Sequence, residues 1–135
     1  DIVFFTHAQL PMNIIHGMPK ETWDYPHKAN SEMNFEETIE FLGSGDIVIT
    51  NSFHGAYWAT LLGKVVCCFP WSSKFYGLKH QPLYCPTTDW WKTINEKEQR
   101  QYKSSLEECR EANKKFHIEL IEHAQNSPRT FKVEI

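Results

Sequence analysis

The chain has 135 residues, 41% of them hydrophobic, which suffices for one compact domain with its own core but not for two. Fourteen basic and seventeen acidic residues give a net charge of −3, and the basic residues form no dense block, so nucleic acid is not expected as a partner. No apolar run approaches the roughly 20 residues that a membrane span needs, which predicts a soluble protein.

The four cysteines lack the spacing of metal and redox sites. Cys67 and Cys68 are adjacent on a predicted buried strand, and Cys85 and Cys109 lie far from them. Neither C-x-x-C pairs nor zinc-like histidine spacings occur. We therefore expect no metal and no cofactor, and reduced thiols in a cytoplasmic protein.

The first predicted element is a buried strand over Ile2 to Thr6, followed by a long loop over residues 7–33 that contains three prolines. Structureless segments longer than about 12 to 15 residues are usually functional or disordered in compact domains. The loop is therefore either the rim of a site or a linker, and we favour the rim.

A first helix is predicted after Asn34, which can cap it with Glu37 as its capping-box partner. Gly43 is expected to end this helix. The apolar residues of one face are Phe35, Ile39 and Leu42. The next predicted strand runs from Asp46 to Thr50.

Ser52 is placed to cap a second helix from about Phe53 to Leu62, and Gly63 follows at a position where positive φ is favourable. A continuous apolar strand comes next, over Val65 to Phe69. Apolar strands that alternate with helices indicate a parallel sheet covered on both faces. We therefore predict a Rossmann-like α/β fold over residues 1–135.

The remaining third of the chain is predicted to be mainly helical. Asn95 and Glu98 have capping-box spacing and open a long helical segment over about residues 95–126. At 1.5 Å per residue a helix of about 30 residues would span about 45 Å, so the segment is either broken or reaches a neighbour. Residues 129–135 alternate weakly, like an edge strand.

The turn after the second predicted strand carries the candidate site. In open α/β sheets, ligands bind outside the carboxyl ends of the strands, where the next helix offers unpaired N–H groups to an anion. At this position His54 is a candidate acid or base near neutral pH. The neighbouring residues expected to bind an anionic donor are Asn51, Ser52, Gly55 and Ala56.

Two alternatives stay open for this turn. His54 could merely cap or pack at the end of the strand. Gly55 could let the backbone approach a phosphate, or it could serve only to pack the helix.

A second polar loop, Trp71 to His80, follows the third predicted strand and should emerge at the same edge of the sheet. Ser72, Ser73 and Lys74 form its candidate anion group, and a solvated loop is the alternative. If both loops belong to one site, His54, Ser52 and Ser73 should face the same cleft.

The segment GDIVITNSFHGAYWATLLGKVVCCFPWSSKFYGLKH, Gly45 to His80, resembles the polysaccharide pyruvyl transferase family. Members of that family carry a strand, a polar-x-x-His-Gly turn, a helix of small residues, Gly-x-x-Val and a later Ser/Asp-x-Lys segment. Many of them have Arg two residues before the histidine, where this chain has Ser52. Positive charge would then come from Lys74 or from a missing partner domain.

The resemblance implies the C-terminal half of a two-domain, glycosyltransferase-like enzyme that moves pyruvate from phosphoenolpyruvate to sugar hydroxyls as a ketal. Its implied partners are an anionic donor, a glycan acceptor and the missing N-terminal domain. Two other hypotheses remain: a nucleotide-sugar glycosyltransferase domain that binds the donor diphosphate at the same helix, and a noncatalytic carbohydrate-binding domain.

Overall fold

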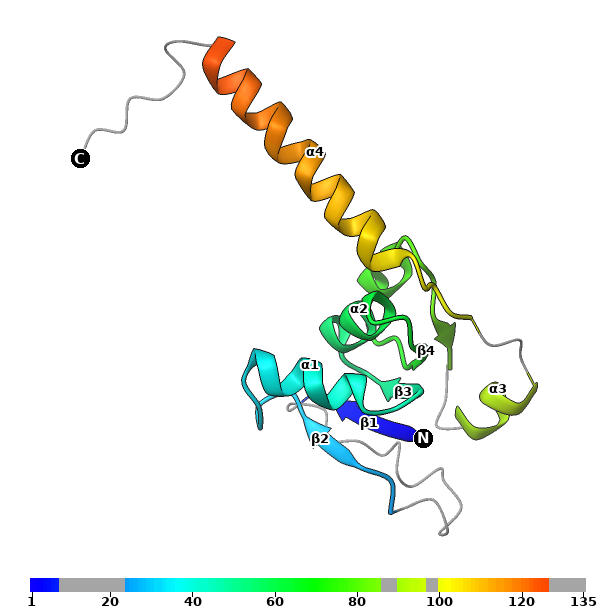
Figure 1. The fold of residues 1–135 in the computed structure, drawn as a ribbon. Coiled ribbons are helices and arrows are strands. Elements are labelled where there is room, and N and C mark those ends of the chain that lie inside the picture. Colours follow the sequence, from blue (N-terminus) through cyan, green and yellow to red (C-terminus); the bar gives the residue numbers. More distant parts are fainter. Residues whose placement is uncertain (8–23, 86–89, 97–99, 127–135) are drawn as a thin grey trace. The chain divides into compact units, whose positions relative to one another are not determined.

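The computed structural model describes residues 1–7, 24–85, 90–96 and 100–126, and it divides the chain into two units, Asp1–Ser105 and Leu106–Ile135. The first unit contains a five-stranded, wholly parallel sheet in the order β2-β1-β3-β4-β5 (Figure 1). In chain order its strands are β1 (Ile2–Thr6), β2 (His27–Ala29), β3 (Ile47–Thr50), β4 (Val65–Cys68) and β5 (Leu83–Tyr84). This sheet and its helices confirm the predicted Rossmann-like α/β fold.

Strand β2 corrects the expectation of one long loop between residues 7 and 33. It pairs in parallel with β1, with Phe4 opposite His27 and Thr6 opposite Ala29. His27 and Lys28 are exposed, so this short edge strand shows none of the apolar pattern that marks a buried strand. Residues 8–23, which include Pro11, Pro19 and His16, lie outside the described part of the chain.

The sheet buries both of its faces because successive side chains of a strand point in opposite directions. On one face, residues from β1, β3 and β4 pack with Leu42 of α1 (Phe35–Gly43) and with Ala56 and Ala59 of α2 (Phe53–Leu61). On the other face, Phe4, Ile49 and Cys67 pack against Trp90 of α3 (Trp90–Glu96). Helices therefore cover both faces, as the fully apolar strands predict.

The ends of α1 and α2 follow the capping signals in the sequence. Asn34 accepts a hydrogen bond from the N–H of Glu37, and the Glu37 carboxylate accepts one from the N–H of Asn34, which confirms the capping box. Ser52 caps α2 through a hydrogen bond from the N–H of Gly55 to its Oγ. Gly63, just beyond α2, has φ of +74°, as expected for a glycine that follows a helix.

The long helical segment predicted over about residues 95–126 is divided in the structure. Helix α3 ends at Glu96, and α4 runs from Ser105 to Asn126. Asn95 therefore lies inside α3, where its Nδ2 donates to the carbonyl of Trp91, and the capping box proposed at Asn95 is wrong. The weak strand predicted at residues 129–135 falls outside the described residues.

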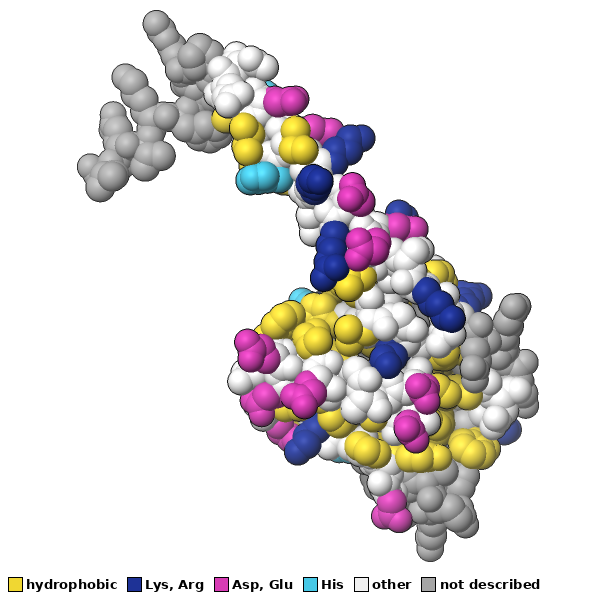
Figure 2. Space-filling view, in the orientation of Figure 1, with side chains coloured by type: hydrophobic (Ala, Val, Ile, Leu, Met, Phe, Trp, Pro, Cys, Tyr) yellow, Lys and Arg dark blue, Asp and Glu magenta, His cyan; other side chains and the backbone are white. Residues whose placement is uncertain are grey.

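In the described residues, no helix is both long and apolar enough to cross a membrane. On the face of the molecule seen in Figure 2, Lys and Arg side chains are interspersed with acidic ones rather than gathered in one block. This mixed surface agrees with the scattered charges of the sequence.

Candidate active site

The order of the strands creates one point at which the chain changes direction across the sheet. Strand β1 lies between β2 and β3; the chain reaches β2 on one side of it, then crosses through α1 to β3 and continues to β4 and β5 on the other side. Ligands of open α/β sheets bind outside the carboxyl ends of the strands at such a switch point. In this fold, the switch point lies between β1 and β3.

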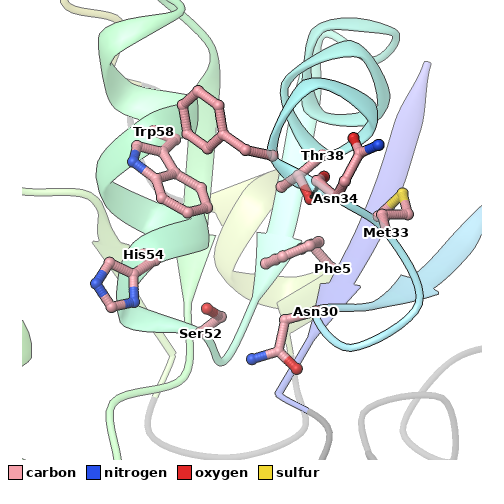
Figure 3. A pocket seen from close by; sticks show the side chains of 9 residues that line it. Phe5, Asn30, Met33, Asn34, Thr38, Ser52, His54 and Trp58 are labelled. Atoms are coloured by element: carbon pink, nitrogen blue, oxygen red, sulfur yellow. Dashed lines mark hydrogen bonds between the residues drawn. The ribbon is translucent and has the colours of Figure 1, made fainter.

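A pocket of about 240 Å³ opens at this switch point, at the carboxyl ends of β1 and β3. Its polar lining consists of Asn30, Asn34, Thr38, Ser52 and His54. Its apolar lining consists of Phe5, Met33, Phe35 and Trp58. Figure 3 shows His54 and Trp58 projecting from α2 on one side, Asn30, Asn34 and Met33 on the opposite side, and Phe5 and Ser52 between them.

His54 occupies the rim of this pocket. It lies in the first turn of α2 and is exposed to solvent. The ring centroid lies 5.3 Å from that of Trp58 and 5.8 Å from that of Phe53. Two aromatic neighbours thus flank the imidazole of this exposed residue.

Gly55 and Ala56 were expected to bind the donor, and their backbone N–H groups make hydrogen bonds within α2. The N–H of Gly55 donates to Ser52 Oγ at 3.1 Å, and that of Ala56 donates to the carbonyl of Ser52 at 2.9 Å. Among the described residues, the N–H groups of Phe53 and His54 make no hydrogen bond. They are the N-terminal helix donors that remain for an anion, and no acidic residue lies in this first turn. Donor binding at Gly55 and Ala56 stays a prediction, and the structure shows that their N–H groups already have acceptors within the helix.

Gly55 is required by packing between the helix and the strand. A Cβ on this residue would lie 2.5 Å from Cδ2 of Phe5 and 2.8 Å from Oγ1 of Thr50. Gly55 is buried, which favours the packing interpretation over a close approach of a phosphate. The glycine acts indirectly, because it lets α2 start close enough to β1 for His54 and Phe5 to share one pocket.

Asn51 joins the loops that leave three neighbouring strands. Its Oδ1 accepts a hydrogen bond from the N–H of His7, just after β1, at 2.7 Å. Its backbone carbonyl accepts one from Nε1 of Trp71, which follows β4, also at 2.7 Å. Asn51 is buried, and these two hydrogen bonds hold the loops together.

Ser72, Ser73 and Lys74 are the second group of residues predicted to bind an anion. Lys74 contacts the turn of His54 through Phe53, but none of the three residues lines the pocket. Ser72 precedes the short 3-10 helix η3 (Ser73–Gly77), and its buried Oγ has no hydrogen-bond partner among the described residues. Ser73 and Lys74 are exposed. The Lys74 ammonium lies 5.0 Å from the ring centroid of Phe53 and 5.7 Å from that of Trp71. The Phe53 ring thus has both the lysine and the neighbouring His54 beside it.

Sequence reasoning missed several residues of the pocket. Asn30 and Met33 come from the segment that was predicted to be a loop, and both line the pocket. Phe5, Thr38 and Trp58 belong to elements that were predicted correctly, yet only the packing of α1 beside α2 brings them together. Asn34 was recognised as a helix cap. Its position at a helix N-terminus was the one signal in the sequence that it could line a pocket.

Of the other histidines, His27 is exposed on β2, His80 stacks on Tyr102 with ring centroids 4.7 Å apart, and His117 is exposed on α4. No group of three or more His, Cys, Asp or Glu side chains within the described ranges could hold a metal ion.

Comparison with known proteins gives one family. The family model of the polysaccharide pyruvyl transferases matches residues 4–73, slightly more than half of the 135 residues. Neither the curated proteins nor the solved structures compared with the chain give a match. The matched segment runs from β1 through the His54 turn to the start of η3 and so contains the pocket. The chain belongs to the polysaccharide pyruvyl transferase family, whose members are transferases of polysaccharide biosynthesis.

Proposed function

We propose that the protein transfers pyruvate from phosphoenolpyruvate to two hydroxyl groups of a sugar, which then carries it as a ketal. The observation that carries the proposal is the position of His54, exposed on the first turn of α2 at the pocket of the strand switch point. This residue lies inside the segment that the family model matches. No cofactor takes part in the proposed reaction.

The reaction needs proton transfer at two kinds of atom. C3 of phosphoenolpyruvate gains a proton, C2 forms a bond to each of two sugar oxygens, and the bond between C2 and the phosphate oxygen breaks. Of the two protons that the hydroxyl groups lose, one balances the proton gained at C3 and the other leaves with the phosphate. A histidine can donate the first proton and accept the next near neutral pH, so we assign His54 the role of acid and base.

The anionic donor needs positive charge beside His54. Lys74 reaches this turn through its contact with the Phe53 ring, and the N–H groups of Phe53 and His54 lie at the positive end of α2. Ser52 stands where many family members carry Arg, but its buried hydroxyl is already the cap of α2. Lys74 therefore takes the charge-pairing role in the proposal, as a point charge without the fork geometry of arginine.

The pocket at the strand switch point is small. Sites for drug-sized ligands enclose about 300–1,000 Å³, whereas this pocket encloses about 240 Å³. Such a volume suits one small ring or a three-carbon acid better than a nucleoside diphosphate sugar. We place the reaction in the cytoplasm, a compartment in which cysteine thiols stay reduced.

The test compares His54→Asn with His117→Asn, an exposed histidine of α4, in the full-length protein. Phosphate release from phosphoenolpyruvate is followed with a glycan acceptor, and nucleotide release from nucleotide-sugars is followed in parallel. We expect His54→Asn to lower kcat by about a hundredfold or more and to change donor affinity little, because acid–base catalysis typically contributes 10²–10⁴-fold. His117→Asn should behave as the unaltered protein does.

Three results would contradict the proposal. Release from nucleotide-sugars alone would make the protein a glycosyltransferase. Release from neither donor, with glycan binding intact, would leave a noncatalytic binding domain. Unchanged kcat in His54→Asn would remove the histidine from the chemistry.

A further inference from the structure

The pocket has the lining of a site for a neutral, hydroxyl-rich ring. Among the described residues that line it, none is Lys, Arg, Asp or Glu, and His54 at the rim is its one titratable side chain. Amide and hydroxyl groups come from Asn30, Asn34, Thr38 and Ser52. The indole of Trp58 supplies an aromatic surface, held between the edge of Phe35 and the ring of His54. Such a mixture can hydrogen-bond sugar hydroxyls and contact the apolar face of the ring.

Charge on the two sides of His54 is unequal. On the pocket side, the first turn of α1 carries Glu36 and Glu37, whose carboxylates oppose the positive end of that helix and disfavour an anion nearby. On the other side, the first turn of α2 carries no acidic residue, and Lys74 lies over the Phe53 ring. An anion is therefore favoured beside Phe53 and Lys74, and a neutral ligand is favoured in the pocket.

From this separation, we infer that the pocket holds the sugar ring that receives the pyruvyl group, while phosphoenolpyruvate lies on the Lys74 side of His54. The inference rests on the proposed function for the identity of the donor. It gives His54 a position between the two substrates, where one imidazole can reach both a sugar hydroxyl and the methylene carbon of the donor. Trp58 and Asn30 then determine acceptor binding from opposite sides of the pocket (Figure 3).

The first test measures kinetics in the full-length protein with each substrate varied in turn. Trp58→Leu and Asn30→Ala should each raise KM for the acceptor, Trp58→Leu by about tenfold, and leave KM for phosphoenolpyruvate within about twofold. Lys74→Ala should show the reverse pattern. Trp91→Leu is the matched control, because Trp91 is an exposed tryptophan of α3, which packs on the other face of the sheet, and it should change neither value. If Trp58→Leu and Asn30→Ala raise KM for phosphoenolpyruvate instead, the pocket is the donor site and the inference is wrong.

The second test does not depend on turnover. Saturation-transfer NMR with the methyl glycosides of glucose, galactose and N-acetylmannosamine should show binding of at least one sugar to the full-length protein. That signal should be lost in Trp58→Leu and kept in Trp91→Leu. Failure of phosphoenolpyruvate to react would refute the proposed function, yet the sugar signal would still support the pocket assignment. If none of the three glycosides binds, or if Trp58→Leu still binds, the inference is overturned.

Discussion

Two residues of the family motif, Ser52 and Gly55, have structural roles in place of the donor contacts that their residue types suggested. Ser52 was expected to bind the donor, yet it is 2% exposed and its Oγ accepts the N–H of Gly55. Gly55 was expected to let a phosphate approach, yet the space beside it is filled by Phe5 and Thr50. Both residues therefore position His54 by fixing where α2 begins and how closely it approaches the sheet. His54 itself is exposed in this turn.

Gly55→Ala should lower the free energy of unfolding by about 1–3 kcal/mol, because the new methyl group overpacks a filled site. Gly43→Ala is the matched control: Gly43 lies at the end of α1, where an added Cβ would meet nothing within 4 Å, so the change should be neutral or stabilise by up to about 1 kcal/mol. Urea unfolding of the full-length protein measures both. Equal stabilities for the two variants would show that the contact with Phe5 does not restrict position 55 to glycine.

At the scale of elements, the caps decide where the pocket-forming helices begin. Asn34 caps α1 and Ser52 caps α2, and both residues also line the pocket. The first turns of two helices thus meet at the carboxyl end of the sheet. A change in either cap should affect stability and the shape of the site together.

Asn34→Ala should destabilise the protein by about 0.5–2 kcal/mol, because the N–H of Glu37 loses its acceptor. Asn34→Ser keeps a capping oxygen and should lose only a few tenths of a kcal/mol. Ser31→Ala, an exposed residue of the preceding turn, is the control and should change little. Thermal and urea unfolding of the three variants test this order; an equal loss in Asn34→Ala and Asn34→Ser would argue against the cap.

At the scale of the whole molecule, the buried interior of the sheet makes stability depend on pH. Burial raises the pKa of the Cys68 thiol on β4 from 9.0 to about 12. Burial also raises the pKa of the Tyr84 hydroxyl on β5 from 10.0 to about 12. Both groups are neutral when protonated, so the folded state keeps their protons at a pH where the unfolded chain has lost them. Between about pH 9 and pH 12 the folded state therefore binds more protons, and its stability falls as pH rises.

We expect the free energy of unfolding to decrease between about pH 8 and about pH 10.5, and Cys68→Ala to reduce the slope of that decrease. The slope is the relevant readout, since the substitution also leaves a cavity in the core. Cys109→Ala, on α4, is the control and should keep the original slope. Urea unfolding at the two pH values measures the slopes; the same slope in Cys68→Ala and the unaltered protein would exclude the thiol as its cause.

The sequence by itself determined the local structure of the site and its family. The apolar strands, the capping residues Asn34 and Ser52, and Gly63 with its positive φ are signals carried by neighbouring residues, so they could be recognised without a structure. The same holds for His54 and the motif around it, which fits the family match. Strand β2 was missed, because a short polar edge strand leaves little periodic signal. A break in the long helical segment was one of two expected alternatives, but its position before α4 could not be read from the sequence.

Only the tertiary structure decided which residues form the pocket. Phe5, Asn30, Thr38 and Trp58 lie far apart in the sequence, and they meet because β1 is placed between β2 and β3 and because α1 packs beside α2. The same packing turned Gly55 inward and left Lys74 over Phe53 rather than in the pocket. Strand order and helix packing arise from contacts between distant segments, whereas caps and strand patterns arise from adjacent residues. Those distant contacts place His54 at the rim of a pocket whose lining contains no Lys, Arg, Asp or Glu, and they place Lys74 outside that lining.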